Sequence, residues 1–71
     1  MATWTNEYMD MQYYPAKREK GKTYVSVARW TNFAELCEWF PGCGFSPIKT
    51  RHDTVEAAKK AGEAIVSRGR V

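Results

Sequence analysis

Two early stretches of the chain alternate between hydrophobic and polar positions, which is the pattern of a half-buried β-strand. The first covers residues 3–14 weakly, and the second is TYVSVARW at 23–30. The polar segment AKREKGKT joins them and contains Gly21 near its end. Two such runs around a glycine-containing turn predict an antiparallel hairpin.

The alternation also predicts which side chains of this hairpin share a face. Val25 and Val27 fall on one face, and we group Met9, Met11 and Tyr13 with them as the face that packs a helix. The other face then carries four large aromatic side chains: Trp4, Tyr8, Tyr24 and Trp30. Since a helix covers only one face of a small sheet, we expect these four residues to form an exposed partner-binding surface.

The hydrophobic period changes in the segment TNFAELCEWF at 31–40. Its apolar positions have the i, i+3, i+4, i+7 spacing of a helix face: Phe33, Leu36, Cys37 and Phe40. Asn32 and Glu35 have the spacing of a capping box, and Pro41 and Gly42 mark an end. We therefore expect a short helix here, followed by a third strand over 45–51 that Pro47 restricts to a sheet edge or a bulge.

The C-terminal segment has the clearest helical pattern. Asp53 is the expected N-cap with Glu56 at N3, and one face is formed by Val55, Ala58, Ala61, Gly62 and Ile65. A glycine inside a helix costs about 1 kcal/mol, so Gly62 among these small residues indicates close contact between helix and sheet. The sequence thus predicts one small α+β domain over 1–71, in the order β-β-α-β-α, with about three antiparallel strands.

Composition agrees with an ordinary globular domain. Of the 71 residues, 44% are hydrophobic and 27% are charged, and three Trp, four Tyr and three Phe are present. No apolar run approaches the roughly 20 residues that cross a bilayer, and the polar, acidic N-terminus is unlike a signal peptide. With only two cysteines and no disulfide framework, we expect a cytoplasmic protein that does not enter a membrane.

Candidate catalytic chemistry is sparse. Cys37, Cys43 and His52 lack the ligand number and spacing of a structural zinc site. A nucleophilic Cys43 needs an adjacent base, and His52 is the only histidine. Paired carboxylates and a glycine-rich phosphate loop are also missing from the pattern. We therefore expect a protein that is not an enzyme and binds no metal or cofactor, with Cys43 in a structural turn.

Positive charge gathers at the predicted hairpin tip. The formal net charge is +3, and the segment KREKGK at 17–22 carries four positive charges and one negative. A basic hairpin with nearby aromatic residues is one way in which small sheets bind RNA or DNA. The candidate residues for this alternative are Lys17, Arg18, Lys20, Lys22 and Arg29.

Four ordered blocks resemble the HicB antitoxin family: YYPA at 13–16, KGKTYVSV at 20–27, FPGC at 40–43 and HDTVEAAKKAGEAI at 52–65. The resemblance implies a non-catalytic protein that binds and blocks a partner, which in that family is an RNA-cleaving toxin. A phage or mobile-element inhibitor, such as an anti-CRISPR protein acting on a host nuclease complex, is an alternative of the same size. The order of strands and helix is also that of small DNA-binding sheets, such as the arm-binding domains of tyrosine recombinases. A homodimer that uses the same aromatic surface is a further alternative.

Overall fold

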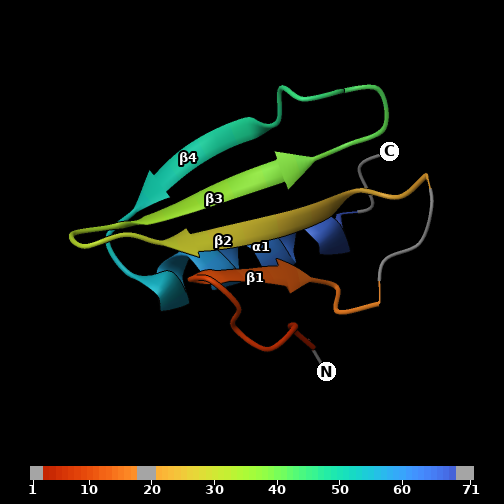
Figure 1. Ribbon diagram of the computed structural model, residues 1–71. Helices are drawn as coiled ribbons and strands as arrows, with labels where there is room; N and C mark the ends of the chain where they lie inside the picture. The colour runs from red at the N-terminus through yellow and green to blue at the C-terminus, as the bar shows by residue number, and fades with distance from the viewer. Residues whose placement is uncertain (1–2, 18–20, 69–71) are drawn as a thin grey trace.

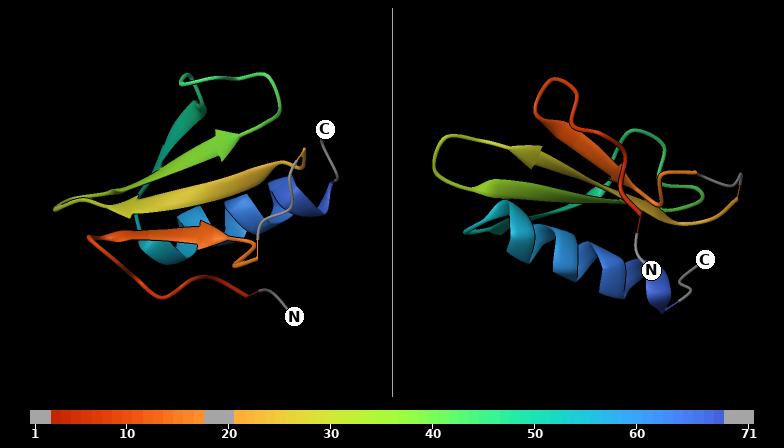
Figure 2. Two further views of the ribbon diagram at one scale, coloured as in Figure 1. Left: turned by 45° about the vertical axis from the view of Figure 1, so that its right-hand side comes forward. Right: turned by 90° about the horizontal axis from the view of Figure 1, so that it is seen from below.

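The computed structural model describes residues 3–17 and 21–68 of the 71-residue chain. This part forms a four-stranded antiparallel sheet followed by one helix (Figure 1). The elements are β1 (Met11–Tyr14), β2 (Tyr24–Arg29), β3 (Ala34–Trp39), β4 (Ile48–His52) and α1 (Val55–Ser67). The strands lie in the order β1-β2-β3-β4, so each strand pairs with its neighbour in sequence. Figure 2 shows α1 lying across one face of this sheet.

The predicted α+β class is confirmed, but the order is ββββα because the short helix expected at 31–40 is wrong. Ala34–Trp39 forms β3, which pairs with β2 on one side and with β4 on the other. Leu36 and Cys37, which share a helical face in the sequence pattern, point to opposite faces of the strand. Two ladders satisfy the backbone of this segment, and that tertiary gain outweighs a helical period carried by only four residues.

The expected capping box at Asn32 is also wrong, because residues 30–33 form the tight turn between β2 and β3. The backbone N–H of Trp30 donates to the carbonyl of Phe33 at 2.9 Å. Asn32 is exposed in this turn rather than at the start of a helix.

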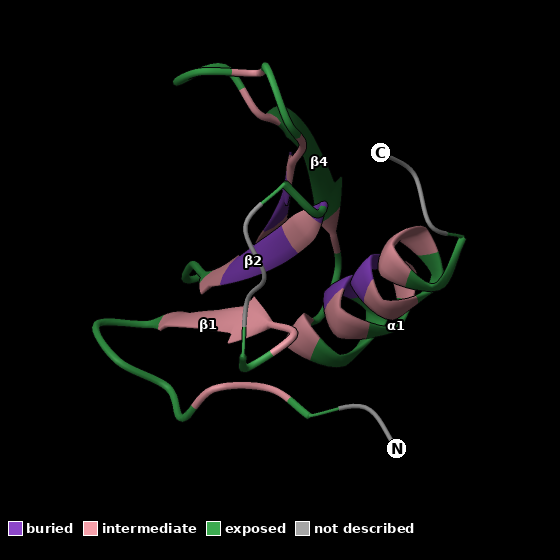
Figure 3. Ribbon diagram, turned by 90° about the vertical axis from the view of Figure 1, so that its right-hand side faces the viewer, coloured by how far each residue is buried: buried purple, intermediate pink, exposed green. Residues whose placement is uncertain are grey.

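The core lies between α1 and the covered face of the sheet (Figure 3). Its buried members are Val25, Val27, Ala34, Leu36 and Ala58. A Cβ on Gly62 would lie 2.8 Å from Cγ2 of Val25 and 3.1 Å from Cδ1 of Leu36. The close approach of helix and sheet inferred from Gly62 is therefore confirmed.

The helix begins one residue later than the sequence predicts. Thr54 has an extended backbone and is the N-cap, since its Oγ1 accepts a hydrogen bond from the N–H of Ala57 at 3.1 Å. Asp53, the expected cap, is exposed in the short link between β4 and α1. Either side chain has the chemistry of a cap, so the position was decided by where β4 ends.

The first predicted strand is shorter than expected, and its faces are inverted. β1 covers only Met11–Tyr14, and Met11 and Tyr13 pair with Ala28 and Ser26 on the face that α1 leaves open. Tyr14, one position further on, packs against the core. The error has a local cause: Met9 and Asp10 adopt positive φ in a turn, and a strand alternation does not continue through such a turn.

The two edges of the sheet differ. Residues 3–8 run beside β1, where the N–H of Thr5 donates to the carbonyl of Tyr13 at 3.0 Å and that of Ala16 to the carbonyl of Thr3 at 2.9 Å. β4 forms the other edge, as predicted from Pro47, and it begins directly after that proline. Within the described residues, the one helix is too short and too polar to span a membrane.

Candidate partner-binding surface

Trp4 does not lie on the face predicted for it. Its ring packs against the core on the helix side, and its Nε1 donates to Oε2 of Glu63 at 2.7 Å. Nζ of Lys59 lies 5.4 Å from the centre of the same ring. The ring of Tyr14 is its aromatic neighbour, at 5.1 Å between centroids. Trp4 therefore anchors the N-terminal segment to α1 and is not part of the candidate surface.

Tyr24 lies on the open face, as the alternation predicts, but in an aromatic cluster that spans three strands. Its ring stacks on Trp39 of β3 at 6.1 Å between centroids and contacts Tyr13 of β1 at 6.3 Å. Nε1 of Trp39 donates to Oγ of Ser26 at 3.0 Å, which buries this serine beneath the rings. Because the rings of Tyr24 and Trp39 stack on each other, the ring faces in this contact are not available for stacking on bases.

Tyr8 and Met9 project from a tight turn next to β1. The backbones of Tyr8 and Met11 exchange two hydrogen bonds of 3.0 Å, and the residues between them, Met9 and Asp10, have φ of 51° and 63°. Two central residues at positive φ are the mark of type I′ turns, which favour Asn and Gly. A methionine in this conformation is uncommon and costs about 1–2 kcal/mol. Despite that strain, its side chain is 79% exposed rather than packed in the core.

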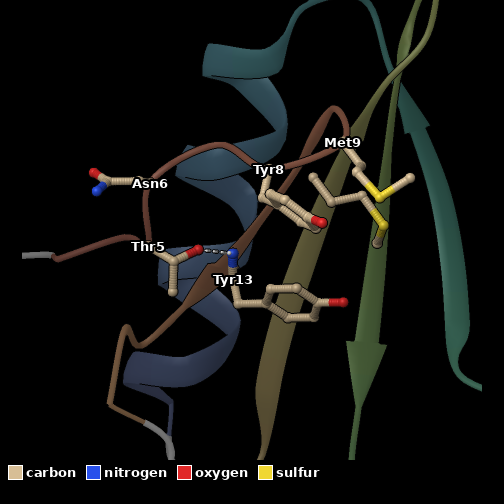
Figure 4. A pocket seen from close by; sticks show the side chains of 6 residues that line it. Thr5, Asn6, Tyr8, Met9 and Tyr13 are labelled. Carbon is tan, nitrogen blue, oxygen red and sulfur yellow. Dashed lines mark hydrogen bonds between the residues drawn. The ribbon is translucent and has the colours of Figure 1, made fainter.

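Two shallow hollows meet at this methionine. The first is lined by Thr5, Asn6, Tyr8, Met9, Met11 and Tyr13. The second is lined by Met9, Asp10, Met11, Ala28, Arg29 and Trp30. Figure 4 shows Tyr8, Met9 and Tyr13 side by side in front of the strands, with the helix behind them. We define the Met9 surface as the apolar residues of both hollows: Tyr8, Met9, Met11, Tyr13, Ala28 and Trp30.

Trp30 extends this surface at the turn between β2 and β3. Its side chain is 55% exposed and stacks on Phe33, with 6.1 Å between ring centroids. The guanidinium carbon of Arg51 lies 4.3 Å from the centre of the Phe33 ring. Large exposed apolar groups beside a cation are the composition typical of protein contact sites.

The predicted basic residues do not form one patch in the described part of the chain. Lys17 and Lys22 are exposed near the start of β2, while Arg18 and Lys20 lie outside the described residues. Arg29 ends β2, roughly 20 Å along the strand from Lys22 by the usual rise per residue. Its Nη2 donates to Oε1 of Glu7 at 2.8 Å, and this hydrogen bond raises the pKa of Arg29.

The two cysteines and the histidine lie in three different places: Cys37 in β3, Cys43 in the turn after β3 and His52 at the end of β4. Cys37 is buried on the open face, and burial, followed by the charge of Glu35, raises the pKa of its thiol. Cys43 lies in the turn after β3, where its N–H donates to the carbonyl of Phe40 at 3.1 Å. His52 Nε2 lies 3.1 Å from Oγ1 of Thr50. Among the described residues, no three His, Cys, Asp or Glu side chains gather in a metal-binding group.

Sequence reasoning misplaced several residues of the open face. Met11, Tyr13 and Trp39 lie on the open face, yet the pattern assigned the first two to the core and the third to a helix. The Tyr8–Met11 turn contains no glycine or asparagine, and Asp10 is its one residue of a type that favours positive φ, which is a weak signal. Once β3 is treated as a strand, its alternation alone places Trp39 beside Tyr24.

Comparisons of the chain with protein-family models, with curated proteins and with solved structures find no match. The fold and the surface therefore rest on the geometry described above, which defines a small α+β domain with one open sheet face.

Proposed function

We propose that this chain is a small non-catalytic binding protein that sequesters or inhibits a partner protein through the Met9 surface. The resemblance to HicB antitoxins favours a toxin as that partner, and an inhibitor of a host nuclease complex is the alternative with the same surface. In either case the chain acts by occupying a site on its partner, and its own residues perform no chemistry.

The observation that carries the proposal is the conformation and exposure of Met9. Its backbone is strained at φ 51°, and its side chain stands in solvent between two apolar hollows. Strained residues persist where the surrounding structure holds them, and they cluster at binding and active sites. Methionine is unbranched and polarizable, so it adapts to the shape of a partner. The neighbouring Tyr8 and Trp30, 77% and 55% exposed, are of the residue types that dominate protein hot spots.

The test separates folding from binding with a single substitution. Met9→Gly removes the partner contact and also relieves the positive-φ strain, so the domain should be as stable as the wild type or about 1 kcal/mol more stable. Affinity for a protein retained from extracts of the native host should fall at least about tenfold, the scale of one hot-spot residue. Chemical denaturation measures the first quantity, and titration calorimetry with the purified partner measures the second.

Asp10→Asn is the matched control, because asparagine tolerates positive φ, keeps the shape of the side chain in the second hollow and leaves Met9 in place. It should retain wild-type affinity. The proposal fails if Met9→Gly folds normally and binds the retained protein as tightly as the wild type does.

A further inference from the structure

β4 is an uncovered sheet edge. It pairs with β3 over the whole of Ile48–His52, and no other segment of the described chain pairs with its outer side. Figure 1 shows β4 at the margin of the sheet, away from β1 and the N-terminal segment. Alternate residues of such a strand present unpaired N–H and C=O groups, which is a template for another strand.

The side chains of β4 carry positive charge and no carboxylate. Lys49 and Arg51 are paired with Cys37 and Glu35, so both lie on the open face of the sheet. Between them Thr50 lies on the helix side, and Ile48 on the same side is 44% exposed. Every residue of β4 is exposed except His52, which is half-buried.

A second copy of this chain is a poor occupant of the edge. In a two-fold antiparallel pairing centred on Thr50, with both open faces on the same side, Lys49 of one copy lies opposite Arg51 of the other. Moving the centre by one residue brings Lys49 opposite Lys49, or Arg51 opposite Arg51. Like charges directly opposite each other destabilise a pair of strands, and Lys on an edge is a known protection against self-pairing.

The positive charges of Lys49 and Arg51, which repel a second copy, favour an added strand that carries negative charge. We propose that β4 accepts an extended acidic segment of a partner protein, with Asp or Glu at every second position opposite Lys49 and Arg51. The backbone hydrogen bonds of the added strand provide affinity, and the two cations provide specificity. This edge lies at the side of the sheet opposite β1, and of its two cations only Arg51, over the Phe33 ring, adjoins the Met9 surface; the backbone ladder and Lys49 are independent of that surface.

The test uses a short capped peptide in which Glu and Val alternate. In an NMR titration with this peptide, the amide chemical shifts of residues 48–52 should change, and hydrogen exchange of these amides should slow. Lys49→Glu combined with Arg51→Glu should weaken binding at least about tenfold and should gain binding of a peptide in which Lys replaces Glu. The dispersion of the amide chemical shifts in the same titration shows whether the variant is folded. If the variant unfolds, Lys49→Gln with Arg51→Gln replaces it, with the same expected loss of the Glu peptide.

Two controls separate strand addition from simple charge attraction. Lys22→Glu with Lys60→Glu changes the net charge equally at exposed sites outside β4, and it should retain most of the affinity. A peptide in which Glu and Pro alternate has the same charge but cannot form the ladder, so it should bind at least about tenfold more weakly. The proposal is overturned by equal binding of the two peptides, by no binding of the Glu–Val peptide, or by protection of the β4 amides in a self-paired dimer. It is also overturned if only a single-stranded oligonucleotide binds at Lys49 and Arg51.

Discussion

The two tryptophans that the sequence places on one surface, Trp4 and Trp30, have different roles in the structure. Trp4 is half-buried, packs against the core and donates to Glu63, whereas Trp30 is largely exposed and touches Phe33. The difference arises from the turn at Met9 and Asp10. This turn folds residues 3–8, which include Trp4, back along the outer edge of β1.

Substitution of the two residues should therefore give opposite results. Trp4→Ala should lower the free energy of unfolding by about 2–4 kcal/mol, since it removes a large side chain from the helix–sheet contact. Trp30→Ala should change that free energy by no more than about 1 kcal/mol, the worth of an aromatic pair, and should weaken partner binding by about 1–2 kcal/mol. Denaturant unfolding and calorimetry measure these quantities. If the Trp30→Ala variant unfolds while the Trp4→Ala variant stays folded, Trp30 and Phe33 belong to the core and not to a binding surface.

At the scale of elements, the packing of α1 on the sheet depends on Gly62. The Cβ of an alanine at this position would lie 2.8 Å from Cγ2 of Val25, a stiff and fully buried side chain. Helix propensity favours Ala over Gly by about 1 kcal/mol, while overpacking of a core costs about 1–3 kcal/mol. The steric cost of the alanine Cβ exceeds its gain in helix propensity, because the helix cannot move away from the sheet without losing its other contacts.

Gly62→Ala should therefore destabilise the domain by about 1 kcal/mol in urea unfolding. Ala64→Gly on the exposed side of the same helix is the comparison, and it should lose about 1 kcal/mol from propensity alone. A Gly62→Ala variant that is more stable than the wild type would mean that α1 lies further from Val25 than the structure shows.

The distribution of charge over the described chain weighs against strong nucleic-acid binding. The net charge is only +3, Arg29 is ion-paired with Glu7, and the cations of the described chain are dispersed over both ends of β2, the β4 edge and α1 with its C-cap. Affinity for RNA or DNA comes largely from counterions released by clustered phosphate contacts.

We expect the purified chain to bind a single-stranded oligonucleotide weakly, with log K falling by no more than about 1 for each tenfold rise in salt, as for one or two phosphate contacts. Fluorescence anisotropy across a salt series measures it. A fall of log K of about 3 per tenfold rise in salt, the value for four phosphate contacts at about 0.7 each, that disappears when Lys17, Arg18, Lys20 and Lys22 are replaced together would establish the hairpin as a nucleic-acid site instead.

The parts of the fold that the sequence predicted are those governed by local patterns. The helix of 55–67, the strand at 24–29 and the edge strand after Pro47 each follow from a period, a cap or a proline, and all three are present. The close contact at Gly62 follows from its position among small residues, because only a near surface explains a glycine there.

The rest was decided by tertiary structure. Residues 34–39 carry patterns for both a helix and a strand, and the two neighbouring strands select β3 because they satisfy its backbone on both sides. The turn at Met9 and Asp10 has only the aspartate as a sequence signal, yet it sets which face Met11 and Tyr13 occupy and leaves Trp4 on the helix side. Interactions between near neighbours in the chain are thus enough to predict the class of fold and its final helix. The composition of the exposed surface depended on strand pairing and on one strained turn, which only contacts between distant residues can hold in place.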